Sequence, residues 1–135
     1  MSPWPTLAVL ALVTSTVSCA ATTYDTSIST QTAAPTTTVL PTGTAAQLLP
    51  TLVTTAADLS NLIADQGDKT ANVERVEALW AAVQAEVTGK DRDIATEIAA
   101  EIVKGRDAAR LNRPAAADKV YRSLKDLVQA YLSLP

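Results

Sequence analysis

Paired carboxylates are the side chains of this sequence whose type and spacing could support chemistry. Glu97 and Glu101 stand four residues apart, and Glu74 and Glu77 stand three apart, so each pair would share one face of a helix. In helical bundles, inward-pointing glutamates bind iron together with Glu-x-x-His motifs. This sequence contains no histidine, and Glu97 and Glu101 flank the isoleucine stripe of their segment. We therefore favour a solvated helix face, and keep Glu97 and Glu101 as the candidate metal ligands of the alternative.

Other kinds of catalytic group are missing from the sequence. Histidine, the commonest general base, is absent. The sequence also contains neither a glycine-rich phosphate loop nor a nucleophile with a base. The net charge of −3 gives no basic excess to neutralise nucleic-acid phosphates. Arg106, Arg110 and Arg113 gather in "GRDAARLNR", which fits either a solvated helix end or a small anion site. We expect no catalytic residue, no cofactor and no nucleic-acid partner, and hence no enzyme.

Cys19 is the single cysteine of the chain. A disulfide within the chain is thereby excluded, and a nucleophilic role would need a nearby base. The stretch "TVSC" resembles the lipobox of bacterial lipoproteins: Ser18 and Val17 fit the family pattern, while Thr16 stands where leucine is usual. In that family the cysteine thiol is acylated and the cysteine becomes the first mature residue. The resemblance implies a lipid on Cys19.

The segment before Cys19 has the character of an export signal. Residues 1–24 carry no charged side chain, and the apolar run Leu7–Val13 is followed by small residues. A membrane-spanning helix needs about 20 mainly apolar residues, which this run does not reach. Its length fits the apolar region of a secretory signal, although "MSPWP" lacks the usual positive charge. We predict a signal peptide over 1–18, followed either by lipid anchoring on the extracytoplasmic side of the membrane or by plain secretion.

Residues 19–44 are predicted to be the lipidated cysteine and a disordered stalk. Within 22–44, twelve of twenty-three residues are Thr or Ser and two are Pro, with no apolar period. Such a segment cannot bury enough surface to offset the entropy lost on ordering. We expect it to hold a folded domain away from the membrane.

From residue 45 onward the apolar spacing predicts helices, near 47–66, 70–88 and 92–111, and from Pro114 to the end. Pro50 places the start of the first helix, since proline fits only the first turn, and Gly67 and Gly89 are expected to end the first and second helices. Short connections between helices of similar length force antiparallel neighbours. Residues 45–135 are therefore predicted to form an all-α, up-and-down antiparallel four-helix bundle, or three helices if the first is loose.

The apolar positions recur at intervals of three and four residues and mark the expected core. They are Leu52, Ala56, Leu59 and Ile63; Val73, Val76, Trp80, Val83 and Val87; Ile94, Ile98 and Ile102, joined by Val103; and Val120, Leu124, Val128 and Tyr131.

Two segments carry a further resemblance. Over about residues 70–132, the chain resembles small exported helical proteins of high-GC Gram-positive bacteria. The resemblance lies in the segments "ANVERVEALWAAVQAEV" and "LNRPAAADKVYRSLKDLVQAYL". The shared features are a Glu-Arg-Val-Glu-x-x-Trp turn and a helix start at Arg-Pro. A remoter likeness is to extracytoplasmic helical domains of iron-uptake systems, whose usual ligands are Glu and His.

These observations give two hypotheses. The first is a lipid-anchored, extracytoplasmic binding or scaffolding module that contacts the membrane through Cys19 and has an extracytoplasmic protein partner. The alternative is an accessory iron-handling protein of an uptake system that uses Glu97 and Glu101.

Overall fold

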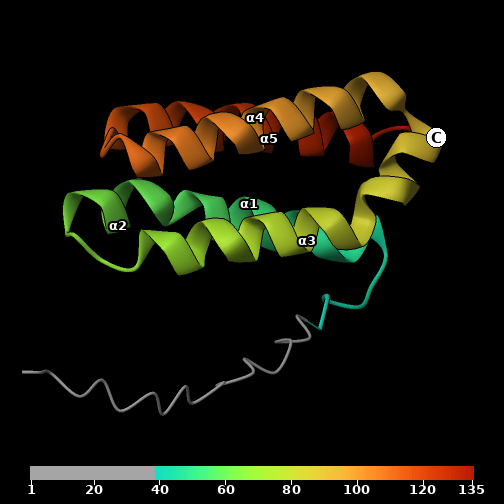
Figure 1. The fold of residues 1–135 in the computed structure, drawn as a ribbon. Helices are drawn as coiled ribbons and strands as arrows, with labels where there is room; N and C mark the ends of the chain where they lie inside the picture. Colours follow the sequence, from blue (N-terminus) through green and yellow to red (C-terminus); the bar gives the residue numbers. More distant parts are fainter. Residues whose placement is uncertain (1–38) are drawn as a thin grey trace, which may run out of the picture. The chain divides into compact units, whose positions relative to one another are not determined.

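The computed structural model describes residues 39–135, so the predicted signal peptide, Cys19 and most of the predicted stalk lie outside the described residues. Five α-helices follow one another: α1 (Ala45–Ala57), α2 (Leu59–Ala64), α3 (Lys69–Lys90), α4 (Arg92–Arg110) and α5 (Pro114–Leu132). Residues 39–135 contain no β-strand. Because Asp58 alone separates α1 from α2, these two form a single arm of the bundle (Figure 1).

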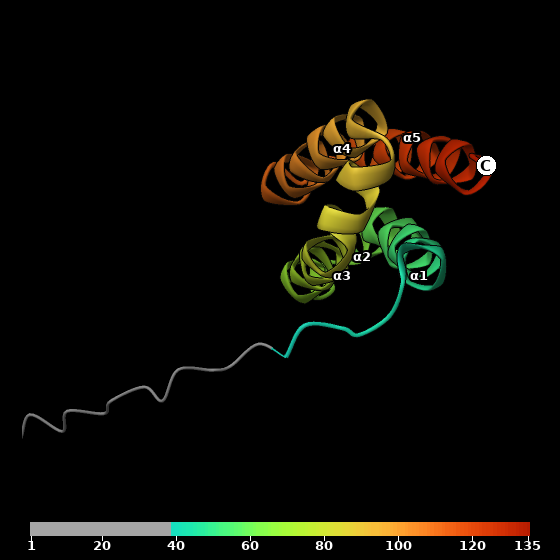
Figure 2. The same cartoon turned by 90° about the vertical axis from the view of Figure 1, so that its right-hand side faces the viewer.

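The arms pack in the order of the chain. α1 packs against α3, α3 against α4 and α4 against α5, and α5 closes the ring by packing on α1 and α2. Seen along the bundle, the first arm and α3 lie beneath α4 and α5 (Figure 2). The predicted all-α, up-and-down four-helix bundle is confirmed. The first arm belongs to it, so the three-helix alternative is wrong.

The start of α1 differs from the prediction. It begins at Ala45, and Pro50 lies inside the helix rather than in its first turn. The Thr44 amide donates to Gln47 Oε1 at 3.1 Å, and the Ala45 amide donates to Glu86 Oε2 of α3 at 2.8 Å. These bonds satisfy amides that a helix start otherwise leaves without partners, which offsets the amide that Pro50 lacks.

The predicted ends of the first two helices also need correction. Gln66, not Gly67, takes the left-handed conformation after α2, with φ 56°, and the Gly67 amide donates to the Leu62 carbonyl at 2.8 Å. That bond closes the turn in the way common at helix ends. Gly89 ends nothing, because α3 continues to Lys90 and Asp91 alone connects α3 to α4.

The core is aliphatic and closely follows the predicted stripes. Trp80 is buried in register with the valines of α3, as predicted, and no polar or charged residue of 39–135 is buried as a whole. Val73 and Ile94, also predicted for the core, are only partly buried at its edge. Val103 departs furthest from the prediction, which joined it to the isoleucine stripe, because it is 48% exposed. Its position one residue beyond Ile102 turns it about 100° away from the core.

Gly105 faces the core of α4 and leaves room for a methyl group. A Cβ placed there would lie 3.4 Å from Val120 Cγ1 and 3.9 Å from Leu59 Cδ2, which are ordinary contact distances. A small apolar void of about 10 Å³ adjoins it, lined by Val76 and Leu124 among others. Gly105 is therefore a helix position that glycine weakens without being needed for close packing.

We predict that Gly105→Ala raises the free energy of unfolding by about 0.5–1 kcal/mol, because alanine loses less backbone entropy in a helix. Urea unfolding followed by circular dichroism measures the change. The control Gly105→Leu overfills the same space and should lower stability by about 1–3 kcal/mol. A destabilised Gly105→Ala variant would show that the methyl group does not fit.

Candidate functional site

A hollow between α4 and α5 contains the predicted metal ligands. Glu97 and Glu101 of α4 line it together with Asp126 of α5 and Lys104, and its volume is about 420 Å³. Asp126, on a different helix from the two glutamates, was not predicted to belong to this group. The Glu101 carboxylate accepts a hydrogen bond from Lys104 Nζ at 2.6 Å, and its side chain is only 14% exposed.

The carboxylates of this hollow do not converge on one point. Within residues 39–135, no group of three or more His, Cys, Asp or Glu side chains is arranged to hold a metal ion. The Glu101 carboxylate is paired with the ammonium of Lys104, and Glu97 is exposed. Metal binding by Glu97 and Glu101 stays a prediction that requires side-chain movement.

A second hollow lies between α3 and α4, and we call it the α3–α4 groove. Its volume is about 350 Å³. Glu74 and Glu77 of α3 line one side, and Arg106 and Arg110 of α4 line the other. The remaining lining residues are Val73, Ala109, Lys69 and Thr70. The two sides of the groove thus carry opposite charge around an apolar base.

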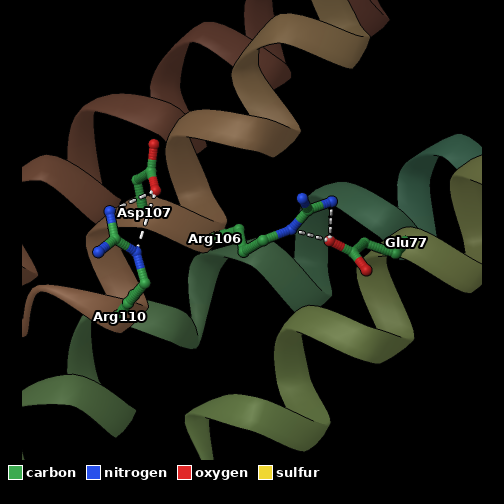
Figure 3. A network of polar contacts seen from close by, with 4 residues as sticks. All are labelled: Glu77, Arg106, Asp107 and Arg110. Atoms are coloured by element: carbon green, nitrogen blue, oxygen red, sulfur yellow. Dashed lines mark hydrogen bonds and ion pairs between the residues drawn. The ribbon is translucent and has the colours of Figure 1, made fainter.

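One ion pair joins the two sides of the groove (Figure 3). Arg106 Nε and Nη2 each lie 2.6 Å from Glu77 Oε1. The two side chains are 57% and 34% exposed, so water screens part of the attraction. The pair links α3 to α4 and accounts for Arg106, one of the three arginines that the sequence placed in a basic cluster.

The other residues of that cluster do not form a shared anion site in this structure. Arg110 Nη2 lies 3.0 Å from Asp107 Oδ1 on its own helix, pointing away from the Glu77 pair (Figure 3). Arg113 is exposed and precedes α5 as its N-cap residue. Arg106 and Arg110 each have a carboxylate partner, which favours the helix-end interpretation of the cluster.

A third hollow, of about 460 Å³, lies between α1 and α3 and is lined by polar side chains. Asn72 of α3 reaches across it: Nδ2 donates to the Thr55 carbonyl at 2.9 Å. Thr55 stands just before the break at Asp58, where α1 carbonyls lose helical partners. Asn72 therefore caps the end of α1, and its buried Oδ1 finds no partner among residues 39–135.

The end of the bundle where α1 begins is closed by contacts between α3 and the C-terminal segment. Lys90 Nζ donates to the Leu134 carbonyl at 3.0 Å and lies 5.3 Å from the centre of the Tyr131 ring. Burial raises the pKa of Tyr131, and the negative charge of Glu86 raises it further. As Glu86 also accepts the Ala45 amide, this carboxylate influences both the start of α1 and the end of α5.

None of the helices described in residues 39–135 has the length and apolar character needed to cross a membrane.

We predict that Glu77 and Arg106 are coupled by about 0.5–1 kcal/mol, the value expected for a partly exposed, well-aligned pair. Urea unfolding of Glu77→Gln, Arg106→Gln and the double variant gives this coupling by a double-mutant cycle. The pair Asp107 and Arg110 is the matched control, since both side chains are more than half exposed and couple more weakly. Equal coupling in the two pairs would contradict this ranking.

We predict that alkaline pH destabilises the domain through Tyr131. Because its pKa is raised, Tyr131 holds its proton more strongly in the folded state than in the unfolded state. The stability that this difference contributes is fully present below the pKa of about 10 in the unfolded chain, and it is lost as pH rises through the pKa in the folded chain. Unfolding free energies at pH 8 and pH 11 should differ less for Tyr131→Phe than for the parent chain. Tyr121→Phe serves as the control. An equal pH dependence in parent and Tyr131→Phe would refute the assignment.

Comparisons with protein-family models, with curated proteins and with solved structures found no match for this chain. The fold itself is a small all-helical domain of four helical arms.

Proposed function

We propose that this protein is a lipid-anchored, extracytoplasmic helical-bundle module that binds or scaffolds a protein partner. The observation that carries the proposal is the position of Cys19, directly after an apolar run and within the lipobox-like "TVSC". The further resemblance of residues 70–132 to small exported helical proteins agrees with it. In this proposal, residues 1–18 are removed and Cys19 becomes the lipid-bearing first residue.

The placement of the tether supports a presenting role. The chain enters the bundle at Ala45, at the end where α3 meets α4, so α2 and the start of α3 lie at the opposite end (Figure 1). A flexible coil of about 25 residues has a root-mean-square reach of roughly 25–30 Å. Such a tether leaves the long sides and the opposite end of the bundle accessible to a partner.

The surface chemistry favours binding over catalysis. The hollows between the helices are lined by exposed ion pairs and short polar side chains, such as Glu77 with Arg106. No charged side chain of residues 39–135 is buried, whereas enzymes commonly bury acids and bases to tune them. The groove sides and their charges are suited to recognition of another protein surface.

Cys19→Ala should abolish labelling by a palmitate analogue and release the protein from the membrane fraction. Each buried methylene contributes about 0.8 kcal/mol to membrane binding, so loss of the lipid removes the anchor. In-gel fluorescence after metabolic labelling, together with fractionation, measures both effects. Ser18→Ala keeps a small residue before the cysteine and should remain labelled. An unlabelled parent chain would rule out the anchor.

A second candidate function is accessory iron handling, favoured by the gathering of Glu97, Glu101 and Asp126 around one hollow. If it holds, ferrous or ferric iron should bind with measurable heat in calorimetry, and Glu97→Gln with Glu101→Gln should remove that heat. Glu74→Gln with Glu77→Gln, on α3, is the matched control. Absence of heat at millimolar iron would exclude this function.

A further inference from the structure

The α3–α4 groove has sides of opposite charge and an apolar base. Glu74 and Glu77 stand on α3, whereas Arg106 and Arg110 stand on α4. Lys69 is the one cation on the α3 side, and its ammonium donates to Asn112 beyond the end of α4. Val73 and Ala109 lie between the charged rows. The groove is therefore acidic along one helix and basic along the other.

Two of these charges are available to another molecule. The Glu77 and Arg106 side chains neutralise each other across the groove. Glu74 is exposed and has no ion-pair partner among residues 39–135. Arg110 is paired with Asp107, but these side chains are 66% and 53% exposed, and such pairs contribute less than about 1 kcal/mol. Arg110 can exchange this weak partner for another carboxylate.

Exposed apolar surface adjoins the charged groups. Val103 stands three residues before Arg106 and seven before Arg110, so it shares their face of α4. It is among the few large aliphatic side chains of the described helices that are almost half exposed. Covering Val103 together with the groove base would remove apolar area from water, while the charges set the orientation of the partner.

A surface with one acidic side and one basic side is complementary to a second copy of itself. A twofold axis that runs along the groove places the α3 side of one copy against the α4 side of the other. We propose that the α3–α4 groove is a self-association surface, on which two copies of this chain pack side by side in parallel. Glu74 of each copy then faces Arg110 of the other.

The opposite orientation is disfavoured by the same charges. A twofold axis that crosses the groove would place acid against acid and base against base, and like charges directly opposite each other are destabilising. The parallel arrangement also brings the two α1 starts to the same end of the pair (Figure 1). Two copies tethered to one membrane can therefore associate without either turning over.

The interface is small. Two helices about 30 Å long present a side of about 600 Å² a copy, less than the roughly 800 Å² a partner typical of stable complexes. We therefore expect weak association in solution, and tethering to one membrane would strengthen it by raising the effective concentration. The charge pattern is independent of Cys19, so the self-association surface stands whether or not the chain carries a lipid.

Charge reversal tests the surface. The full chain with Cys19→Ala, which removes any lipid, is examined by sedimentation equilibrium from 10 µM to about 1 mM at low salt, where screening is weak. Glu74→Arg and Arg110→Glu should each weaken dimerisation about tenfold, because each creates two like-charge contacts in the symmetric pair. The double reversal should restore dimerisation to within about threefold of the parent, with unchanged helicity. A monomeric parent, or a double reversal as weak as the single ones, would overturn the proposal.

Cysteine cross-linking tests the orientation. Thr70 lines the far end of the groove, and Gln84 lies fourteen residues later on the same face of α3, about 21 Å away. In the Cys19→Ala chain, Thr70→Cys and Gln84→Cys should each be joined to its own counterpart by a flexible bismaleimide, because the parallel pair holds the two copies of each residue at the same height, one on each side of the groove. Gln129→Cys, on α5, is the control and should not. Cross-linking only in a mixture of Thr70→Cys and Gln84→Cys would indicate antiparallel packing and refute the parallel pair.

Discussion

The single-residue connection at Asp91 sets the register on which the rest of the bundle depends. Its backbone is extended, with φ −151° and ψ 108°, and its amide still donates to the Val87 carbonyl at 2.8 Å. Its side chain accepts from the Ile94 amide at 2.9 Å and so caps α4 as it closes α3. With no slack between the two helices, the valine and isoleucine stripes can meet in only one alignment.

That alignment explains which surface charges meet. Glu77 and Arg106 lie fourteen and fifteen residues from Asp91, so an antiparallel hairpin brings them level with each other. The same geometry arranges Glu74 and Arg110 on opposite sides of the α3–α4 groove, one turn further from the connection. The charge pattern of the groove is thus a consequence of a tight turn more than 20 Å away along the helices, at about 1.5 Å a residue.

The sequence was sufficient to predict the helices and their buried faces, because the apolar spacing directly reflects which side of a helix is covered. Helix ends were harder, because contacts distant in sequence decide them. Ala45 starts α1 through a bond to Glu86, forty-one residues away, which no local pattern around Pro50 reveals. Gln66 adopts the left-handed conformation despite the glycine beside it, because the closing hydrogen bond requires that position in the turn.

In the candidate sites too, the local sequence predicts which residues share a helix face, whereas contacts between helices decide which residues meet. The separation of Glu97 from Glu101 correctly placed them on one helix face, but the Asp126 and Lys104 side chains beside them depend on how α5 packs against α4. The Glu77–Arg106 pair had a usable signal in the sequence, namely nearly equal distances from the turn, fourteen and fifteen residues. It could be read only after the turn had been placed at Asp91 rather than at Gly89.

The buried start of α1 has a mechanical consequence. A pull on the N-terminal segment reaches the domain at Thr44 and Ala45, where the amides are bonded to Gln47 and Glu86 and the Ala45 side chain is fully buried. The load therefore passes at once into α3 instead of unwinding a frayed helix end. Glu86 therefore links the point at which the chain enters the bundle directly to α3.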